Sequence, residues 1–311
     1  MKRFFALFLC VALLLCACRV PPDTQKEKDT MKLLIIGNSH SIDAFHFLYD
    51  AFKDQLPEQK LTIGVLHFSG CSISTHLQFA THNKPMYVYF LNEDGNWVIT
   101  EDNKMRNVLK DQRWDMVMFQ AAKSDLDESL NEAGRRGLEE YVRKFTAEDV
   151  QFLWHTSWPS PNDDRFFVPG VVPEGYKENL QNLYGFDPVN QFTVLTDMAK
   201  AHILTDEHYA KAVCTGAAIM HAHKALLIPQ AKLWRDHTHL SDFGRLMAAY
   251  AMYAQLTGNT VESVGIDVIP AEDRHFMFRE EGDLTVTDHM KKSIANAANH
   301  SLSDPWTVPG K

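Results

Sequence analysis

The chain has little cysteine outside its first eighteen residues. Three of its five cysteines, Cys10, Cys16 and Cys18, lie in that leading segment, and only Cys71 and Cys214 follow. Two cysteines cannot build a disulfide framework, so the sequence excludes a disulfide-stapled scaffold. We interpret the remaining pair as buried free thiols. One bridge between them, formed in an oxidising compartment, is the alternative.

A cluster of basic residues is also absent. The 311 residues include 31 Lys and Arg against 40 Asp and Glu, which gives a formal net charge of −9. An acidic chain without a basic patch lacks the electrostatic footprint of a nucleic-acid-binding protein, so we expect no nucleic-acid partner. Internal repeats and low-complexity blocks are absent too. The sequence therefore predicts a single domain, which we place at residues 31–300, followed by a tail at 301–311.

The first eighteen residues have the organisation of an export signal. Lys2 and Arg3 precede an apolar stretch from Phe4 to Leu15, and small residues lead to Cys18. The stretch is shorter than the roughly 20 residues that span a bilayer, and a cysteine at the cleavage point resembles a bacterial lipobox. This resemblance implies a lipid anchor on Cys18 and a place in the cell envelope, with Arg19 favouring the outer membrane. A plain secretory signal and an uncleaved anchor are the alternatives.

Beyond a polar tether at residues 19–30, short apolar runs alternate with amphipathic stretches. This alternation predicts an α/β fold with a central parallel sheet flanked by helices. The predicted parallel strands are Met31–Ile36, Leu61–Phe68, Met116–Phe119, Val150–Trp154 and Ala210–Cys214. A small β-hairpin insertion is predicted across Asp94-Gly95, a dipeptide that favours a tight turn, with arms at Met86–Leu91 and Trp97–Thr100.

Amphipathic spacing predicts the helices of the chain. They lie near residues 43–55, 104–111, 131–145, 191–205, 241–256 and 284–298. The segment Trp158 to Pro188 is rich in Pro, Gly, Asn and Asp, so we expect a long loop there, beside the functional site.

Two short motifs contain the side chains of a serine esterase. Ser39 follows the first predicted strand, and Asp236 and His239 lie three residues apart about two hundred residues later. A serine hydroxyl becomes a strong nucleophile when a histidine takes its proton, and a carboxylate fixes the tautomer of that histidine. In open parallel sheets, functional groups gather where the strands end. We therefore predict Ser39 as nucleophile, His239 as general base and Asp236 as its orienting carboxylate.

Other polar groups lie at the same predicted strand ends. The amides of Ser39 and of Gly70, which follows the second strand, are predicted oxyanion donors together with the Gln120 side chain. Asn38, His155 and Trp158 are predicted to contact the substrate. Structural roles are the alternatives: a helix cap for Asn38 and Ser39, a loop-tying amide for Gln120, and a packed histidine for His155.

The order of these motifs resembles the SGNH, or GDSL-like, hydrolase superfamily over about residues 31 to 258. Ser39 matches its nucleophile block, Gly70 its glycine block, and Asp236 with His239 its terminal Asp-x-x-His block. The segment from Leu233 to Gly244 looks like a subgroup of Bacteroidetes lipoproteins that carry a domain of unknown function. Two positions depart from the superfamily: the first block reads Gly-Asn-Ser instead of Gly-Asp-Ser, and the third block lacks its usual Gly-x-Asn.

The resemblance implies a flavodoxin-like three-layer sandwich whose central parallel sheet has about five strands. It also implies a serine esterase that needs no metal or organic cofactor. A likeness to carbohydrate esterases points to acylated carbohydrate as the substrate, with acetyl or similar groups removed at the cell envelope. The missing Gly-x-Asn bears on the oxyanion hole, because losing one donor can cost about 10²- to 10³-fold in rate.

Two functions of other kinds fit parts of the sequence. A metal-dependent hydrolase would use Asp236, His237 and His239 as ligands, completed by His40, Asp43 or His155, although no second tight ligand pair is present. A surface lipoprotein that binds glycan without turning it over would need an aromatic stacking platform. The tryptophans available for that platform are Trp97, Trp154, Trp158 and Trp234.

Overall fold

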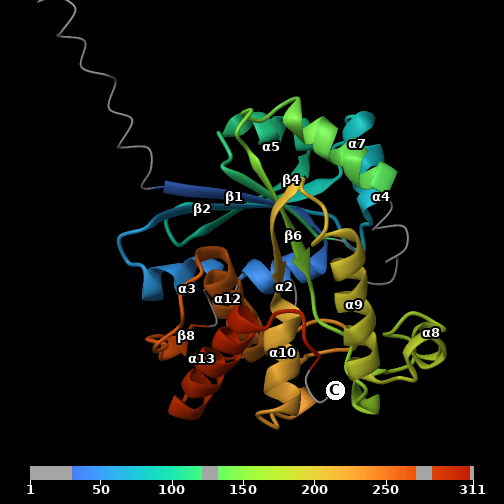
Figure 1. Ribbon diagram of the computed structural model, residues 1–311, viewed down its shortest axis with the longest axis vertical. Coiled ribbons are helices and arrows are strands. Elements are labelled where there is room, and N and C mark those ends of the chain that lie inside the picture. Colours follow the sequence, from blue (N-terminus) through green and yellow to red (C-terminus); the bar gives the residue numbers. More distant parts are fainter. Residues whose placement is uncertain (1–29, 121–131, 271–281, 309–311) are drawn as a thin grey trace, which may run out of the picture.

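The computed structural model describes residues 30–120, 132–270 and 282–308, which form an α/β fold around one large sheet (Figure 1). The predicted signal, the lipidation residue Cys18 and most of the tether lie outside the described residues. Across the described ranges, none of the helices is both long enough and apolar enough to pass through a membrane.

Seven strands form the sheet in the order β4-β3-β2-β1-β5-β6-β7. Neighbours among β2, β1, β5, β6 and β7 pair in parallel, whereas β3 pairs antiparallel with both β2 and β4. The prediction of a five-stranded parallel sheet with a hairpin insertion is therefore confirmed. The strands are β1 (Thr30–Gly37), β2 (Lys60–His67), β3 (Tyr87–Asn92), β4 (Trp97–Asn103), β5 (Met116–Gln120), β6 (Gln151–Thr156) and β7 (Tyr209–Cys214).

The central strands of the sheet are apolar on both sides, as is typical of parallel strands. Helices therefore cover both faces of the sheet. In β1, Leu33 and Ile35 pack into one core, whereas Leu34 and Ile36 pack into the other. On the first face lie α2 (Ser39–Phe45), α3 (Leu48–Gln55), α10 (Thr215–Lys224), α12 (Asp242–Thr257) and α13 (Asp288–Ser303), and on the second lie α4 (Ile73–Thr81), α5 (Met105–Asp111) and α7 (Glu132–Arg143).

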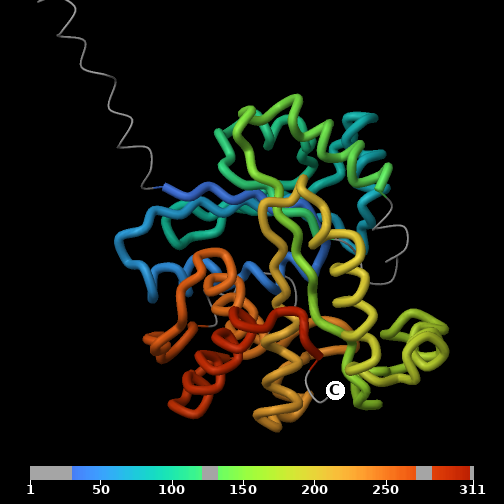
Figure 2. Tube along the Cα trace, viewed as in Figure 1, coloured from blue at the N-terminus to red at the C-terminus, as the bar shows by residue number. Residues whose placement is uncertain are grey.

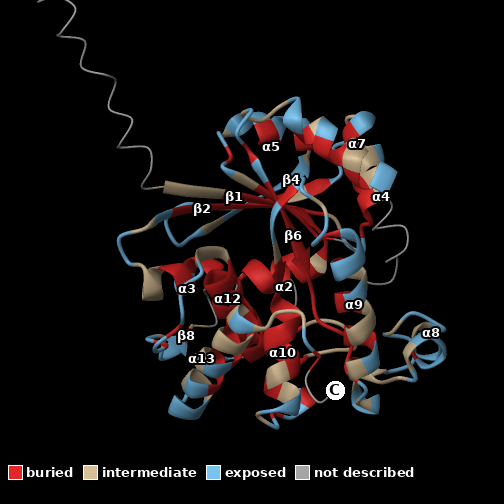
Figure 3. Ribbon diagram, viewed as in Figure 1, coloured by how far each residue is buried: buried red, intermediate tan, exposed pale blue. Residues whose placement is uncertain are grey.

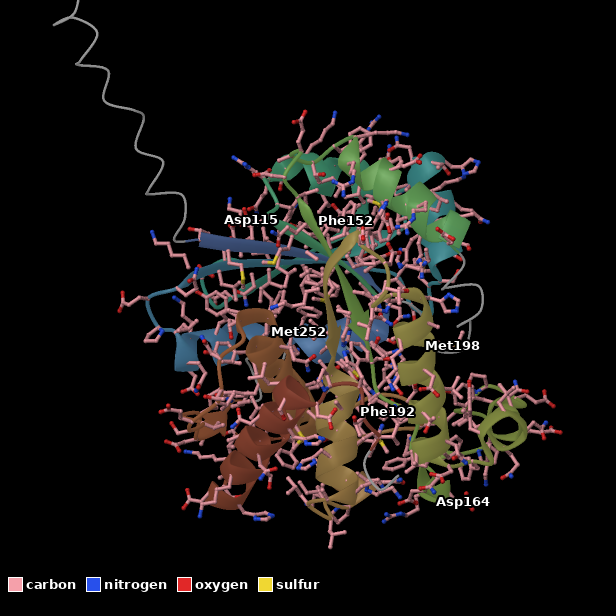
Figure 4. The ribbon with its side chains drawn as sticks, viewed as in Figure 1. Asp115, Phe152, Asp164, Phe192, Met198 and Met252 are labelled. Atoms are coloured by element: carbon pink, nitrogen blue, oxygen red, sulfur yellow. The ribbon has the colours of Figure 1, made fainter. Side chains whose placement is uncertain are left out.

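The figures show this layered arrangement. Figure 3 shows buried residues along the sheet and on the inner faces of the helices. Figure 4 labels one side chain from each core, Met252 of α12 and Phe152 of β6. In Figure 2, α2, in blue, runs beside α12, in orange, although about two hundred residues separate them in the chain. This contact brings the two predicted catalytic motifs together.

Several predicted helix boundaries were wrong. The single helix predicted at 43–55 is two helices, α2 and α3, which meet at His46 and Phe47. The helix predicted at 284–298 begins only at Asp288, because Leu284 and Thr285 form strand β9, which pairs with β8 (Val268–Ile269). Helix α13 also continues into the predicted tail, where Ser301 is fully buried.

Four helices of the described residues were not predicted. These are α4, α10, α11 (Gln230–Leu233) and, within the expected loop at 158–188, α8 (Tyr176–Tyr184), which follows the 3-10 turn η3 (Asp164–Phe166). Helix α8 ends at Gly185 in a left-handed conformation (φ 65°), which glycine adopts readily. Because Pro and Gly flank this short helix, composition alone predicted a loop. Helix α9 (Pro188–His202) precedes β7, and α11 precedes the second catalytic motif.

Candidate active site

The candidate active site lies at the carboxyl edge of the parallel sheet. Parallel pairing aligns the end of β1 at Gly37 with His67 of β2, and the end of β5 at Gln120 with His155 of β6. In such sheets, the chain turns from strand to helix at this edge, so side chains from distant segments meet there. Ser39 lies here, two residues after β1 and at the first position of α2.

Asn38 shapes the turn that carries Ser39. It caps α2: its side-chain oxygen accepts a hydrogen bond from the amide of His40 at 3.0 Å. Its carbonyl oxygen accepts from the amides of Ser41 and Ile42. The first amides of a helix have no partner within the helix. Asn38 accepts from the amides of His40, Ser41 and Ile42. The remaining amide of this turn, that of Ser39, can therefore donate to an outside acceptor such as an oxyanion.

The side chain of Gln120, the last residue of β5, supports the same turn. Its side chain is fully buried, and its Oε1 accepts hydrogen bonds from the Asn38 amide at 3.1 Å and from the Ser41 hydroxyl at 3.0 Å. The prediction that Gln120 lines the oxyanion hole is therefore corrected. The full burial of Gln120 places its side chain beneath the turn, where Oε1 holds the nucleophile turn in place.

The second motif forms a tight hairpin-like turn, which we call the histidine loop, residues 234–240. Trp234 and Leu240 form an antiparallel bridge, and the Arg235 amide donates to the His239 carbonyl at 3.1 Å. Inside this turn, Asp236 Oδ1 accepts from the amides of Thr238 and His239, each at 2.8 Å. The sequence spacing of three residues therefore places the carboxylate beside the imidazole.

Ser39, His239 and Asp236 form one hydrogen-bonded chain. Nε2 of His239 lies 2.8 Å from Ser39 Oγ, and Nδ1 of His239 lies 2.9 Å from Asp236 Oδ2. An ionised carboxylate can only accept, so Nδ1 carries the proton and Nε2 can accept from the serine hydroxyl. The His239 and Asp236 side chains are 13% and 29% exposed, so the chain is sheltered yet reachable from solvent.

Asp236 is kept ionised by its surroundings. Burial on its own raises a carboxyl pKa, but the hydrogen bond and charge of His239, together with the two backbone amides, lower the pKa of Asp236 well below its usual value. A permanently ionised Asp236 can stabilise the imidazolium that forms when His239 takes a proton.

Gly70 lies in an exposed turn that the structure brings next to the nucleophile turn. The Asn38 side-chain nitrogen donates to the carbonyl of Cys71 at 3.4 Å, which ties the two turns together. Gly70 adopts a left-handed conformation with φ 63°, and no atom lies within 4 Å of where its Cβ would be. Glycine suits this position because the conformation is strained for other residues.

The three predicted substrate contacts are corrected to structural roles. Asn38 is 1% exposed and is occupied as the cap of α2. His155 is 2% exposed, its Nε2 lies 2.8 Å from Thr215 Oγ1, and burial lowers its pKa to about 3, so it is a neutral packed histidine. Trp158 is fully buried, and its indole nitrogen donates to the Thr238 carbonyl at 2.9 Å, which supports the histidine loop.

The structure also bears on the two alternative functions, a glycan-binding protein and a metal-dependent hydrolase. Trp154, Trp158 and Trp234 are each at most 4% exposed, so they cannot present a stacking platform to a glycan. Within residues 30–120, 132–270 and 282–308, no three His, Cys, Asp or Glu side chains cluster as a metal site would require. Asp43, a predicted ligand of that site, is instead bound by the guanidinium groups of Arg235 and Arg245.

Sequence reasoning missed the residues that hold the histidine loop. His40 Nε2 lies 3.1 Å from Thr238 Oγ1, and its ring packs edge-on against Trp158. Tyr176 of α8 packs edge-on against His237, with ring centroids 5.1 Å apart. The only sequence signals for these contacts were the position of His40 beside the nucleophile and the expectation that segment 158–188 lies near the site.

The fold and the site together define an α/β protein with a hydrogen-bonded Ser-His-Asp set at the carboxyl edge of a parallel sheet. More particularly, the chain belongs to the family described as "Domain of unknown function (DUF4886)", whose model matches residues 32–267. Comparison with curated proteins gave no match.

A solved structure of the same family shares this fold. A crystal structure of a DUF4886 family protein from Bacteroides uniformis is 24% identical, covers 90% of this chain and 97% of its own, and superposes with a TM-score of 0.70. It shows the same fold. Fainter likenesses include an acetyl xylan esterase from Geobacillus stearothermophilus (TM-score 0.44, 15% identity, 75% of this chain and 97% of that chain) and a putative arylesterase from Agrobacterium tumefaciens (TM-score 0.41, 14% identity, 73% and 99%).

Proposed function

We propose that this protein is a serine esterase of the SGNH type that removes acetyl or similar ester groups from carbohydrate at the cell envelope. The observation that carries the proposal is the unbroken chain from Ser39 Oγ through the His239 ring to the Asp236 carboxylate, with distances of 2.8 and 2.9 Å. Each of these distances lies in the range of a hydrogen bond suited to proton transfer.

The mechanism follows from which atoms donate and which accept. Ser39 Oγ attacks the ester carbonyl as His239 Nε2 takes the hydroxyl proton, and the imidazolium is stabilised by ionised Asp236. The amides of Ser39 and Gly70 are the proposed donors to the oxyanion. His239 then returns the proton to the departing alcohol, leaving an acyl-serine. A water molecule, deprotonated by His239, attacks this ester, and carboxylic acid and free Ser39 are released.

A hollow beside the histidine loop supports an acylated carbohydrate as the substrate. A hollow of about 910 Å³ is lined by residues between Phe167 and Gln181, including Glu174 and Lys177. The ring of Phe167, which lines it, lies 6.2 Å from the His237 ring in the histidine loop. Its wall combines apolar side chains such as Val168 and Val172 with charged groups, a lining that suits a sugar carrying an acyl group.

The test is hydrolysis of para-nitrophenyl acetate and of an acetylated polysaccharide by residues 30–311, with EDTA present. We expect wild-type turnover to survive EDTA and to fall by at least about 10³-fold in both Ser39→Ala and His239→Ala. Loss of activity in EDTA would favour a metal-dependent hydrolase. Glycan binding that persists in Ser39→Ala, with no ester cleaved by the wild type, would favour a glycan-binding lipoprotein.

The substrate and the envelope location are tested separately. Acetate release from the polysaccharide, compared with hydrolysis of para-nitrophenyl octanoate, distinguishes a deacetylase from a lipase. For the full chain expressed in a bacterium, we propose lipidation at Cys18 and anchoring in the outer membrane. Cys18→Ser is then expected to lose labelling by a palmitate analogue and to leave the membrane fraction. Unchanged labelling and fractionation would reject the lipid anchor.

A further inference from the structure

Asp43 links the helix of the nucleophile directly to the loop of the general base. It lies on α2, four residues and about one helical turn beyond Ser39. Its side chain is 1% exposed, and its Oδ2 accepts a hydrogen bond from the amide of Leu240 at 2.8 Å. Leu240 is the residue directly after His239. The carboxylate therefore fixes the backbone next to the base relative to the helix that begins with Ser39.

Two arginines complete this link. Arg245 of α12 donates to Asp43 Oδ1 through Nε and Nη2, each at 2.8 Å, and Arg235 lies 3.1 Å from the same oxygen. Arg235 Nη1 also donates to the carbonyl of Leu240. The Leu240 residue is thus held at its amide by the carboxylate and at its carbonyl by a guanidinium. Both contacts come from groups that are themselves paired.

The two arginines keep Asp43 ionised, which maintains the ion pairs of this cluster. Burial on its own would raise the pKa of Asp43, but Arg245 and Arg235 lower it below its usual value, so Asp43 stays ionised. Arg245 lies 3.2 Å from Asp242 as well, in the first turn of α12. Because Asp43 and Arg245 are each only 1% exposed, removing one partner leaves a buried charge unpaired.

We propose that Asp43, with Arg235 and Arg245, is a positioning residue that sets the distance between Ser39 and His239. The inference rests on the proposed esterase function. Asp43 is hydrogen-bonded to the Leu240 amide next to His239, and its charge also interacts with the His239 imidazole. A misplacement of about 1 Å between reacting groups can cost about 10²-fold in rate, which sets the expected size of the effect.

The same molecule provides a matched control. Asp206 is a partly buried carboxylate that is also held by two arginines, Arg136 at 2.6 Å and Arg135 at 3.6 Å, and it also accepts from a backbone amide, that of His208 at 3.1 Å. It precedes β7, at the opposite edge of the sheet from Ser39. Loss of the Asp206 ion pair would therefore lower stability without moving the nucleophile turn or the histidine loop.

The experiment compares Asp43→Asn with Asp206→Asn in residues 30–311, using para-nitrophenyl acetate well below each variant's melting temperature. Both are expected to melt earlier than wild type. We expect kcat of Asp43→Asn to fall about 10²-fold with KM changed less than about threefold, whereas Asp206→Asn keeps wild-type kcat. Equal kcat in the two variants would overturn the inference.

A second pair of variants covers the case in which Asp43→Asn does not fold. Arg235→Met removes the charge and keeps the apolar stem, whereas Arg235→Lys keeps the charge. We expect a fall in kcat of at least about tenfold for Arg235→Met, partly restored in Arg235→Lys. If Arg235→Met retains wild-type kcat, the link to Leu240 does not position the base.

A readout without turnover separates this inference from the esterase proposal. The Nδ1 proton that His239 shares with Asp236 is expected to give a downfield proton resonance, assigned by its loss in His239→Ala. Asp43→Asn should shift or broaden this signal, and Asp206→Asn should leave it in place. A wild type inactive on every ester would reject the function. An unshifted signal in Asp43→Asn would reject the positioning role.

Discussion

Asp236 holds His239 at two points, since its Oδ1 accepts from the His239 amide at 2.8 Å and its Oδ2 lies 2.9 Å from the His239 ring nitrogen Nδ1. One carboxylate thus fixes both the backbone and the ring of the proposed base. The same short loop is tied to α2 by Asp43 and to the end of β6 by Trp158. The position of the base therefore depends on three separate parts of the chain.

Replacing Asp236 by Asn should impair the base without unfolding the site. An amide can still accept from the backbone amides, but it can also donate to the ring, which favours the tautomer with its proton on Nε2. We expect kcat for para-nitrophenyl acetate to fall by about 10⁴-fold. The melting temperature should fall much less than in Asp236→Ala, which removes every contact. A kcat within tenfold of wild type would show that Asp236 does not orient His239.

Replacing Gly37 by Ala should distort the nucleophile turn. A Cβ at this position would collide with Ser41 Oγ and would lie 2.8 Å from Gln120 Oε1, so the two supports of the turn would have to move. Overpacking of this kind costs about 1–3 kcal/mol, and we expect an accompanying loss of activity. Urea denaturation and turnover of para-nitrophenyl acetate measure both effects.

Gly134→Ala is the control for that substitution. Gly134 lies in α7, where the new Cβ would meet Ser74 Oγ at 3.4 Å, an ordinary contact. Alanine in a helix is about 1 kcal/mol more favourable than glycine. This variant should match or exceed wild-type stability and keep full activity. Similar losses in both variants would indicate that the nucleophile turn is no more sensitive than the outer helix.

The two cysteines of the domain should be inert while it is folded. Cys71 and Cys214 are unpaired and at most 2% exposed, and burial raises the pKa of each thiol to about 12. Since the thiolate is the reactive form, Ellman's reagent should detect neither thiol in native protein and both in guanidinium chloride. Iodoacetamide should leave turnover unchanged. Inactivation by iodoacetamide would instead point to a cysteine in the mechanism.

Stability should fall as the pH drops below about 6.5, because three buried histidines stay neutral in the folded protein. Burial lowers the pKa of His67 to about 4 and of His76 and His155 to about 3. At a pH between the ordinary histidine pKa of about 6.5 and these lowered pKa values, the histidines bind a proton only when the chain is unfolded. Acid therefore favours unfolding. Each histidine should account for about 2 kcal/mol of lost stability between pH 7.5 and pH 5.

Urea denaturation at pH 7.5 and pH 5 of wild type and of His155→Gln measures this effect. Glutamine does not titrate, and its amide can reach Thr215 as Nε2 does. The variant should lose about 2 kcal/mol less than wild type between the two pH values. An equal loss in both proteins would show that His155 is not buried in its neutral form.

The sequence alone predicted the sheet and the contact between Asp236 and His239. Apolar runs such as that of β1 signal buried parallel strands locally, and Asp94-Gly95 signals the hairpin, because both depend on neighbours in the chain. The spacing of Asp236 and His239 likewise predicted their contact, since three residues are close in any tight turn. Short helices such as α8 and α10 were missed, because their formation depends on packing against distant segments more than on local propensity.

Only the tertiary structure decided which polar residues face the substrate side and which support the site. Gln120, His155 and Trp158 lie at strand ends, where the sequence predicts function, yet all three are buried. Asp43, in contrast, was singled out by sequence only as a candidate metal ligand, and its contacts with Arg235 and Leu240 appear only when folding brings these residues against α2. Local periodicity determines which element a residue belongs to. The direction and partners of its side chain depend on contacts between segments about two hundred residues apart, which no local pattern encodes.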